Sequence, residues 1–180
     1  MVRLVRAELH LMDAALAGDE VLAEALGHRV VPGWVTFTEA LGPTRDAVAA
    51  DPSRATWGTR FFVAGDPPEL VGWGGFKGPP RDGVVELGYE IARSRWGRGL
   101  ATAATRAMIA EAFADEEVRL VIAHTMPERN ASNRVLEKAG FVYDGEAREG
   151  GEVVWRFSHA RPRPAAATDE FSAGRPSYRR

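Results

Sequence analysis

A strand, a glycine-containing turn, a helix and a second strand follow one another in the middle of the chain. Residues 84–92, "VVELGYEIA", have the composition of a strand. Beyond Gly97 and Gly99, residues 101–113 repeat apolar side chains at steps of three and four, which is typical of an amphipathic helix. Residues 118–123 are a near-continuous apolar run, as expected for a strand covered on both faces. The sequence therefore predicts a βαβ unit.

The rest of the chain adds further helices and strands around this unit. Before it, the patterns predict a helix over 13–26, a loop or broken helix over 28–42, a helix over 44–50, and an antiparallel hairpin of strands over 60–64 and 69–76. The loop carries Trp34 and Phe37, which the pattern suggests are exposed or half-exposed and could wall a pocket, although a core role is commoner for such residues. After the unit, Asn130 is a good N-cap for a helix through Ala139, Gly140 fits its C′ position, and residues 141–143 and 153–157 form a final hairpin. The expected fold class is α+β, with a mixed, mostly antiparallel central sheet and flanking helices.

Composition limits the possible partners and places one domain over residues 1–159. The 180 residues suit a single domain, and residues 160–180 are so poor in large apolar side chains that we expect a disordered tail, or less favourably a docking arm. The formal charge of −2 gives no reason to expect nucleic acid or a membrane as a partner. The chain has no cysteine, which excludes a thiol nucleophile and thiolate metal ligands. Residues 1–10 do not resemble a signal peptide, so we expect a cytoplasmic protein.

The glycine turn has the properties of an anion site. A loop that opens a helix presents unpaired backbone N–H groups and the positive end of the helix dipole. Gly97 and Gly99 have no Cβ to block a phosphate, and Arg98 adds positive charge. The alternative from the local sequence is that the two glycines serve only a tight strand-to-helix turn. The turn is not a P-loop, because the lysine and the hydroxyl residue that end a P-loop motif are missing after Gly99. It also fits a dinucleotide-binding fingerprint poorly, because Thr102 occupies the position where that motif needs a third small residue. A domain that binds ATP or NAD is therefore a weak alternative.

Two segments, "ELGYEIARSRWGRGLATAATRAMI" and "VIAHTMPERNASNRVLEKAGF", resemble the GCN5-related N-acetyltransferase (GNAT) family, and most closely its ribosomal-protein-alanine N-acetyltransferase branch. The resemblance spans roughly residues 61–157 and implies acetyl-CoA as cosubstrate, with no metal. It implies that the turn holds the pyrophosphate and that the backbone after the strand pairs with pantetheine. In the family's Gln/Arg-x-x-Gly-x-Gly/Ala pattern the first position is Trp96 here. The cofactor-binding residues that the resemblance implies are Ile91, Ala92, Arg93, Trp96, Gly97, Arg98, Gly99, Leu100, Ala101, Thr102, Asn130 and Ser132.

The expected reaction is direct transfer of the acetyl group to a primary amine of a peptide N-terminus or a small molecule, in a ternary complex. Glu86 and Glu90 share one strand face by period-two counting, and we prefer Glu86 as general base, with His124 as another candidate and Ser132 as a third possible catalytic residue. Many relatives carry a tyrosine acid where this chain has Leu136. The alternative is a catalytically silent acyl-CoA-binding module. Relatives of this kind are often homodimers, so a homodimer is possible.

Overall fold

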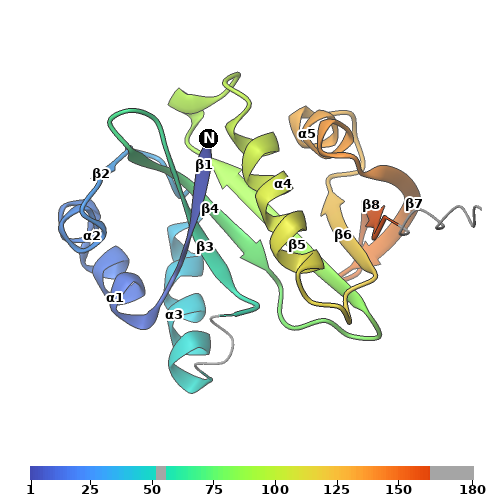
Figure 1. Cartoon of the computed structure of the whole chain (residues 1–180), viewed down its shortest axis with the longest axis horizontal. Helices are drawn as coiled ribbons and strands as arrows, with labels where there is room; N and C mark the ends of the chain where they lie inside the picture. The colour runs from blue at the N-terminus through green and yellow to red at the C-terminus, as the bar shows by residue number, and fades with distance from the viewer. Residues whose placement is uncertain (52–55, 163–180) are drawn as a thin grey trace, which may run out of the picture.

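The computed structural model describes residues 1–51 and 56–162, and these form one mixed sheet with helices packed against it (Figure 1). The strands are β1 (Val2–Arg6), β2 (Arg29–Val30), β3 (Thr59–Ala64), β4 (Glu69–Phe76), β5 (Val84–Ile91), β6 (Leu120–Thr125), β7 (Val142–Glu149) and β8 (Glu152–Ala160). The α-helices are α1 (Leu9–Ala17), α2 (Asp19–Leu26), α3 (Leu41–Ala50), α4 (Leu100–Phe113) and α5 (Ala131–Ala139). Short 3₁₀ turns are η1 (Thr38–Ala40) and η3 (Arg93–Arg95).

The sheet has the strand order β1-β3-β4-β5-β6-β8-β7, with β2 beside β4. The β5–β6 and β2–β4 pairs are parallel, and the other pairs are antiparallel. The expected α+β fold with a mostly antiparallel sheet is therefore confirmed, and so is the βαβ unit, which consists of β5, α4 and β6.

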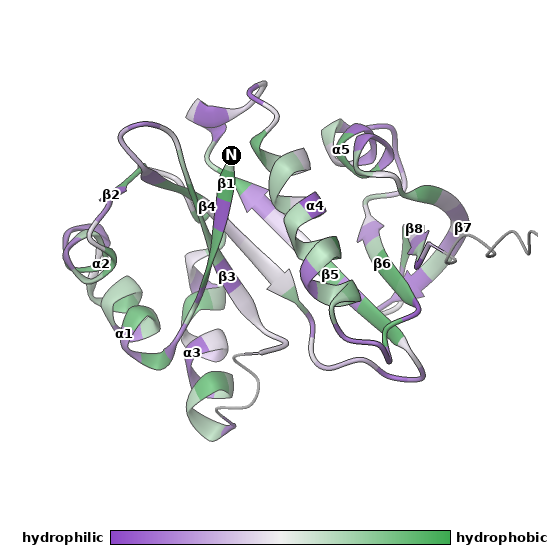
Figure 2. Ribbon diagram, in the orientation of Figure 1, coloured by the Kyte–Doolittle hydropathy of each residue, from purple (hydrophilic) through white to green (hydrophobic). Residues whose placement is uncertain are grey.

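The two faces of the sheet carry separate hydrophobic cores. Along β3, Phe61 belongs to the core with α1–α3 and Phe62 to the core with α4, as alternation of side chains across a strand requires. Small residues of α4 such as Ala104 and Ala112 are fully buried, so this helix lies close on the sheet. Figure 2 shows α4 mostly in hydrophobic colours, whereas α5 has more hydrophilic surface.

The parallel strands β5 and β6 pair over a short length and then separate. Their pairing extends from Val84↔Leu120 to Glu86↔Ile122. In the β4–β5 ladder, the backbone N–H of Lys77 donates to Glu86 and the N–H of Ala92 donates to the carbonyl of Val71. Because backbone groups alternate in direction along a strand, the N–H and C=O groups of intervening Tyr89 and Ile91 point to the other side, toward the gap before β6. In the described part of the chain, no strand pairs with that edge beyond Glu86.

Several details differ from the sequence-based expectations. The helix predicted over 13–26 is two helices, because Gly18 (φ 127°) interrupts it. Of the two aromatics in the loop, Trp34 has the core role, with 1% exposure and its ring edge-on against Phe61 and Trp73, whereas Phe37 is 61% exposed. Strand β1 was not anticipated. The expectation that both faces of β6 are covered holds only in part, because buried residues alternate with residues of intermediate burial over its first four positions.

The packed structure continues slightly beyond the predicted domain end at residue 159. Strand β8 runs to Ala160, and the Arg161 guanidinium donates a hydrogen bond of 2.8 Å to the carbonyl of Val118. The tail predicted over 160–180 lies outside the described residues from position 163 onward. None of the described helices has both the length and the apolar composition required to cross a bilayer.

Candidate functional site

A cavity of ≈ 470 Å³ lies where the open edge of β5, the start of α4 and the helix α5 meet. Its lining combines backbone of the glycine turn with side chains from four separate segments. The lining residues are Thr36, Tyr89, Glu90, Ile91, Arg95, Trp96, Gly97, Gly99, Leu100, Ala101, Thr102, Ala131, Ser132, Arg134, Val135 and Lys138. Eight of these belong to the cofactor-binding set implied by the sequence: Ile91, Trp96, Gly97, Gly99, Leu100, Ala101, Thr102 and Ser132.

The glycine turn forms the end of the cavity at the N-terminus of α4. Gly97 and Gly99 take the left-handed conformation, with φ of 74° and 72°, and Gly99 is the N-cap of α4. A Cβ built on either glycine would meet no heavy atom within 4 Å, so the space above the turn is open. The first N–H groups of α4 have no partner within the helix. The conformation alone requires glycine, and the open space together with those donors gives the turn the form of an anion site.

Basic side chains contribute to the lining of the same cavity. Arg95, Arg134 and Lys138 line the cavity, whereas Arg98 lies in the turn but does not line it. Arg95 is anchored by Glu69, whose carboxylate lies 2.6 Å from the guanidinium. The hydrogen bond from Arg95, supported by Arg29, holds the pKa of Glu69 below its ordinary value. The mouth of the cavity is therefore positively charged, which suits a phosphorylated ligand.

The residues directly after β5 differ in what they offer a ligand. Ala92 is fully buried, and its N–H is bonded to Val71 within the sheet. Arg93 does not line the cavity, and its guanidinium lies over the ring of Trp96, 5.3 Å from the ring centroid. Ile91 lines the cavity, and its backbone faces the open edge of β5. Of these three residues, Ile91 is therefore the one positioned to pair with an extended ligand.

Helix α5 forms the wall opposite β5. Asn130 caps it through a reciprocal pair of bonds with Asn133, as predicted, and does not line the cavity. Ser132 does line the cavity, and its carbonyl accepts a hydrogen bond of 3.3 Å from the Tyr89 hydroxyl. Burial raises the pKa of Tyr89, so its hydroxyl stays protonated at neutral pH. Leu136 is 1% exposed in the core and cannot supply an acid.

On the face of the sheet opposite α4, Glu90 extends the cavity toward the N-terminal segment. One of its carboxylate oxygens accepts hydrogen bonds from the indole of Trp73 and, at 3.0 Å, from the backbone N–H of Thr36. Glu90 and Thr36 both line the cavity. The carboxylate thus connects the sheet to the loop that precedes η1.

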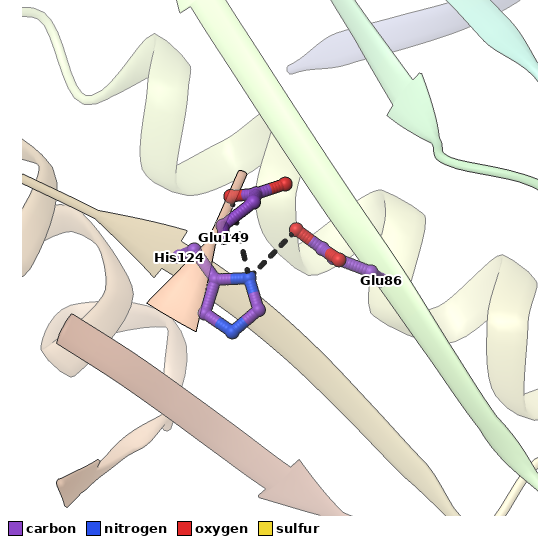
Figure 3. A group of neighbouring side chains, drawn as sticks. All are labelled: Glu86, His124 and Glu149. Carbon is purple, nitrogen blue, oxygen red and sulfur yellow. Dashed lines mark hydrogen bonds and ion pairs between the residues drawn. The ribbon is translucent and has the colours of Figure 1, made fainter. Parts of the chain in front are cut away.

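Glu86 belongs to a different group of charges on the same face. Figure 3 shows Glu86, His124 and Glu149 pointing toward one another from β5, β6 and β7. The Nδ1 atom of His124 lies 3.0 Å from Glu86 and 3.8 Å from Glu149. The Lys77 ammonium lies 2.5 Å from an oxygen of each carboxylate. None of these four residues lines the cavity.

In this group, the positive charge of Lys77 offsets part of the negative charge of Glu86 and Glu149. The hydrogen bond from Lys77 lowers the pKa of Glu149. Burial opposes the charge on Lys77, but its bonds to Glu149 and Glu86 outweigh that effect and raise its pKa. Glu86, His124 and Glu149 are close enough together to be metal ligands, yet Lys77 already supplies a positive charge between the carboxylates. The expectation of a protein without a metal stays a prediction.

Several cavity residues were not identified from the sequence. Tyr89 could have been found, because it lies two positions from Ile91 and therefore on the same strand face. Arg134, Val135 and Lys138 share one side of α5 with Ala131 at helical spacing. Thr36 could not have been found, because only the tertiary structure brings its loop to β5.

Comparison with known proteins identifies the family. The family model described as an acetyltransferase (GNAT) domain matches residues 3–142. The uncharacterized N-acetyltransferase YjdG of Bacillus subtilis (strain 168) is 27% identical over 151 residues, covering 82% of this chain and 90% of YjdG.

Two solved structures illustrate the shared fold. The aminoglycoside acetyltransferase AAC(6')-Ib in complex with coenzyme A is 20% identical, with a TM-score of 0.62, and the match covers 89% of this chain and 95% of that one. The ribosomal-protein-S5-alanine acetyltransferase of Vibrio fischeri is 17% identical, with a TM-score of 0.63, covering 88% and 91%. The fold and the family match together confirm the resemblance: the chain belongs to the acetyltransferase (GNAT) domain family of acyltransferase enzymes.

Proposed function

We propose that this protein transfers the acetyl group of acetyl-CoA directly to a primary amine, with both substrates bound at once. The observation that carries the proposal is the cavity that joins the glycine turn to the open edge of β5. A phosphate group fits the turn, and an extended arm with amide groups fits beside a strand edge whose backbone donors and acceptors have no strand partner among the described residues.

Different residues of the cavity bind different parts of acetyl-CoA. The N–H groups from Gly97 to Ala101 bind the pyrophosphate, with the Thr102 hydroxyl as a further donor and the nearby Arg134 adding charge. Pantetheine pairs with the backbone of Ile91 and continues along β5 toward Tyr89. Structures of AAC(6')-Ib with coenzyme A and of the acetyltransferase MccE with acetyl-CoA and AMP support this assignment, since the fold is shared.

The acceptor amine approaches from the face opposite α4, where Glu90 lies at the cavity. The amine must lose a proton for its nitrogen to attack the acetyl carbonyl, and a carboxylate takes that proton directly or through water. We place the base at Glu90, because it lines the cavity beside Ile91. Glu86, the base preferred from the sequence, lies four residues away, about 13 Å along the strand. It remains the alternative, together with His124, to which it is bonded.

Collapse of the tetrahedral intermediate breaks the carbon–sulfur bond and releases the CoA thiolate. The N–H of Tyr89 points into the gap beside β5, beyond the Ile91 groups that pair with pantetheine, and can stabilise the oxyanion that precedes this step. Ser132 lines the cavity, and we assign its hydroxyl as the donor to the thiolate, which has an ordinary pKa near 8.5. The Tyr89 hydroxyl already donates to the Ser132 carbonyl. The thiolate then takes a proton from water, so a dedicated acid is not required.

The acceptor class follows from the charge on that face and from the amines handled by relatives. Glu90, the carboxylate that lines the cavity, favours the approach of a cationic amine. AAC(6')-Ib has been solved with coenzyme A and kanamycin, and another neighbour is named for an alanine of ribosomal protein S5. A peptide N-terminus and a small polyamine-like molecule are therefore the two classes for a first screen.

A catalytically silent acyl-CoA-binding module is the competing proposal, and the buried Leu136 favours it. Release of CoA thiol in the presence of a panel of amines separates the two. Turnover with any amine would contradict the proposal of a catalytically silent module.

The first experiment is titration of thermal stability with acetyl-CoA, CoA, ATP and NAD, because a ligand that binds only the folded state raises Tm with concentration. We expect acetyl-CoA and CoA to stabilise the protein and the two nucleotides not to do so. The absence of any shift with both CoA compounds would refute the proposed function.

A further inference from the structure

The indole of Trp96 contacts the backbone at the end of the open strand edge. Its Nε1 donates a hydrogen bond of 2.7 Å to the carbonyl oxygen of Ile91. The two residues are five positions apart, separated by the 3₁₀ turn η3, so this bond closes the connection between β5 and the glycine turn. Trp96 itself lines the cavity immediately before Gly97.

The Ile91 carbonyl belongs to the set of backbone groups that face the gap between β5 and β6. Ala92 directs its N–H to β4, where it meets Val71 at 2.8 Å. Its neighbour Ile91 therefore directs its own N–H and C=O to the opposite side. A carbonyl oxygen has two lone pairs, so the indole leaves one acceptor position at Ile91 for a ligand. The Ile91 carbonyl thus accepts the hydrogen bond from Trp96 and keeps a second acceptor position that faces the cavity.

Packing alone does not account for the position of this indole. Trp96 is 58% exposed, although a tryptophan held by the core is usually well buried. Its ring is held from one side by the Arg93 guanidinium, 5.3 Å from the ring centroid, and its N–H by Ile91. The 3₁₀ turn η3, which precedes Trp96, is held in place by Arg95, whose guanidinium contacts Glu69. These contacts orient an exposed side chain toward a backbone acceptor.

We propose that Trp96 is a positioning residue for the pantetheine arm of acetyl-CoA, an inference that rests on the proposed function. By holding the Ile91 carbonyl, the indole N–H fixes the direction of the backbone with which the arm pairs. It does so before the ligand arrives, which lowers the ordering cost of binding. The turn that binds the phosphates keeps its own conformation through the positive φ of Gly97 and Gly99. The effect of Trp96 is therefore specific to the part of the ligand that lies along β5.

The test compares ligands with and without the arm. Trp96→Phe keeps an aromatic ring beside Arg93 and removes the N–H, and Trp96→Leu removes both features. Calorimetric titration measures Kd for acetyl-CoA, for CoA and for adenosine 3′,5′-bisphosphate, which has the nucleotide portion but no pantetheine. We expect both variants to raise Kd for acetyl-CoA and CoA about three- to tenfold, the size of one lost hydrogen bond, and to leave Kd for the bisphosphate unchanged. Phe37→Leu, at another exposed aromatic, is the control and should change none of the three.

Each other outcome overturns the inference. An equal loss for acetyl-CoA and the bisphosphate would mean that Trp96 acts through the phosphate turn. An unchanged or lower Kd for acetyl-CoA in Trp96→Phe would mean that the indole does not assist the arm. If the unaltered protein bound neither acetyl-CoA nor the bisphosphate, the proposed function itself would fail, which distinguishes that failure from failure of the inference about Trp96.

Discussion

Replacing Gly99 by tryptophan tests whether the open space above the start of α4 is the phosphate site. Gly99 lines the cavity, and its φ of 72° is one that residues with a Cβ rarely adopt. The substitution therefore has two effects, backbone strain and a large side chain over the helix N-terminus. A control for the strain exists at Gly27, which ends α2 with φ of 67° and also has no atom within 4 Å of a built Cβ. Gly27 does not line the cavity.

The structure gives separate magnitudes for the two effects. A left-handed conformation costs an ordinary residue about 1–2 kcal/mol, so both Gly99→Trp and Gly27→Trp should lower Tm by about 2–8 °C for a domain of this size. Blocking the phosphate should raise Kd for CoA at least about 100-fold in Gly99→Trp, a loss of about 2.7 kcal/mol. In Gly27→Trp the affinity should not change.

The assay is calorimetric titration of CoA into each variant, with thermal unfolding recorded on the same samples. The unaltered protein and Gly27→Trp should give the same Kd, and the two variants should have similar Tm values. A Kd for Gly99→Trp within threefold of that for Gly27→Trp would refute the assignment of the turn as a phosphate site. A Tm far lower for Gly99→Trp than for the control would instead show that the turn has a larger structural role than its open surroundings indicate.

Four further changes test other parts of the structure. Glu90→Gln should lower kcat about 100-fold or more while leaving Kd for acetyl-CoA unchanged. Glu86→Gln, the matched variant outside the cavity, should lower kcat less. A larger loss of kcat in Glu86→Gln than in Glu90→Gln, measured by steady-state kinetics, would move the base to Glu86. Glu69→Gln removes a carboxylate whose pKa in the folded protein is lowered by two arginines. The stability that this carboxylate contributes is fully present above its unfolded pKa of about 4.3, and it is lost as the pH falls through the lower pKa of the folded protein. The unaltered protein should therefore lose more Tm than Glu69→Gln between pH 6 and pH 3, as measured by thermal unfolding. Arg60→Met removes a fully buried guanidinium that bonds a carboxylate of α4 at 2.7 Å, and should destabilise the fold by about 3 kcal/mol, or about 6–12 °C in Tm; a change under 2 °C would contradict this. Asn130→Ala should cost about 1 kcal/mol in denaturant unfolding through loss of the α5 cap, with CoA affinity little changed because the residue does not line the cavity.

Local signals predicted the central part of the fold well. Helix α5 was located by its cap and by its terminal glycine, and the structure has both, with Gly140 in the left-handed conformation. The βαβ unit was visible because a glycine turn separates two different periodicities. These features depend on neighbours in the sequence, so a single sequence contains them.

What was missed depends on contacts between distant segments. The short edge strand β1, with the sequence VRLVR, lacks a regular two-residue alternation of polar and apolar side chains, and its pairing with β3 makes it a strand. Trp34 lies in a segment with glycine and proline, yet its ring fills the core against Phe61 and its indole donates to Asp19 at 2.9 Å. The position of Glu90 in the cavity depends equally on where the loop at Thr36 lies. No local pattern reports such contacts.

The separation of β5 from β6 beyond Glu86 opens the sheet where the cavity lies, and this cavity is lined by residues from both faces of the sheet. The groups that we propose for CoA binding come from α4, α5 and the glycine turn, whereas the opposite side is formed by carboxylates of the strands and by the segment around Thr36. Each side has its own hydrophobic core, so residues that recognise the acceptor can vary without repacking those that bind the cofactor. Such an arrangement lets one scaffold change its choice of amine over evolution, or by design, while its acetyl donor stays the same.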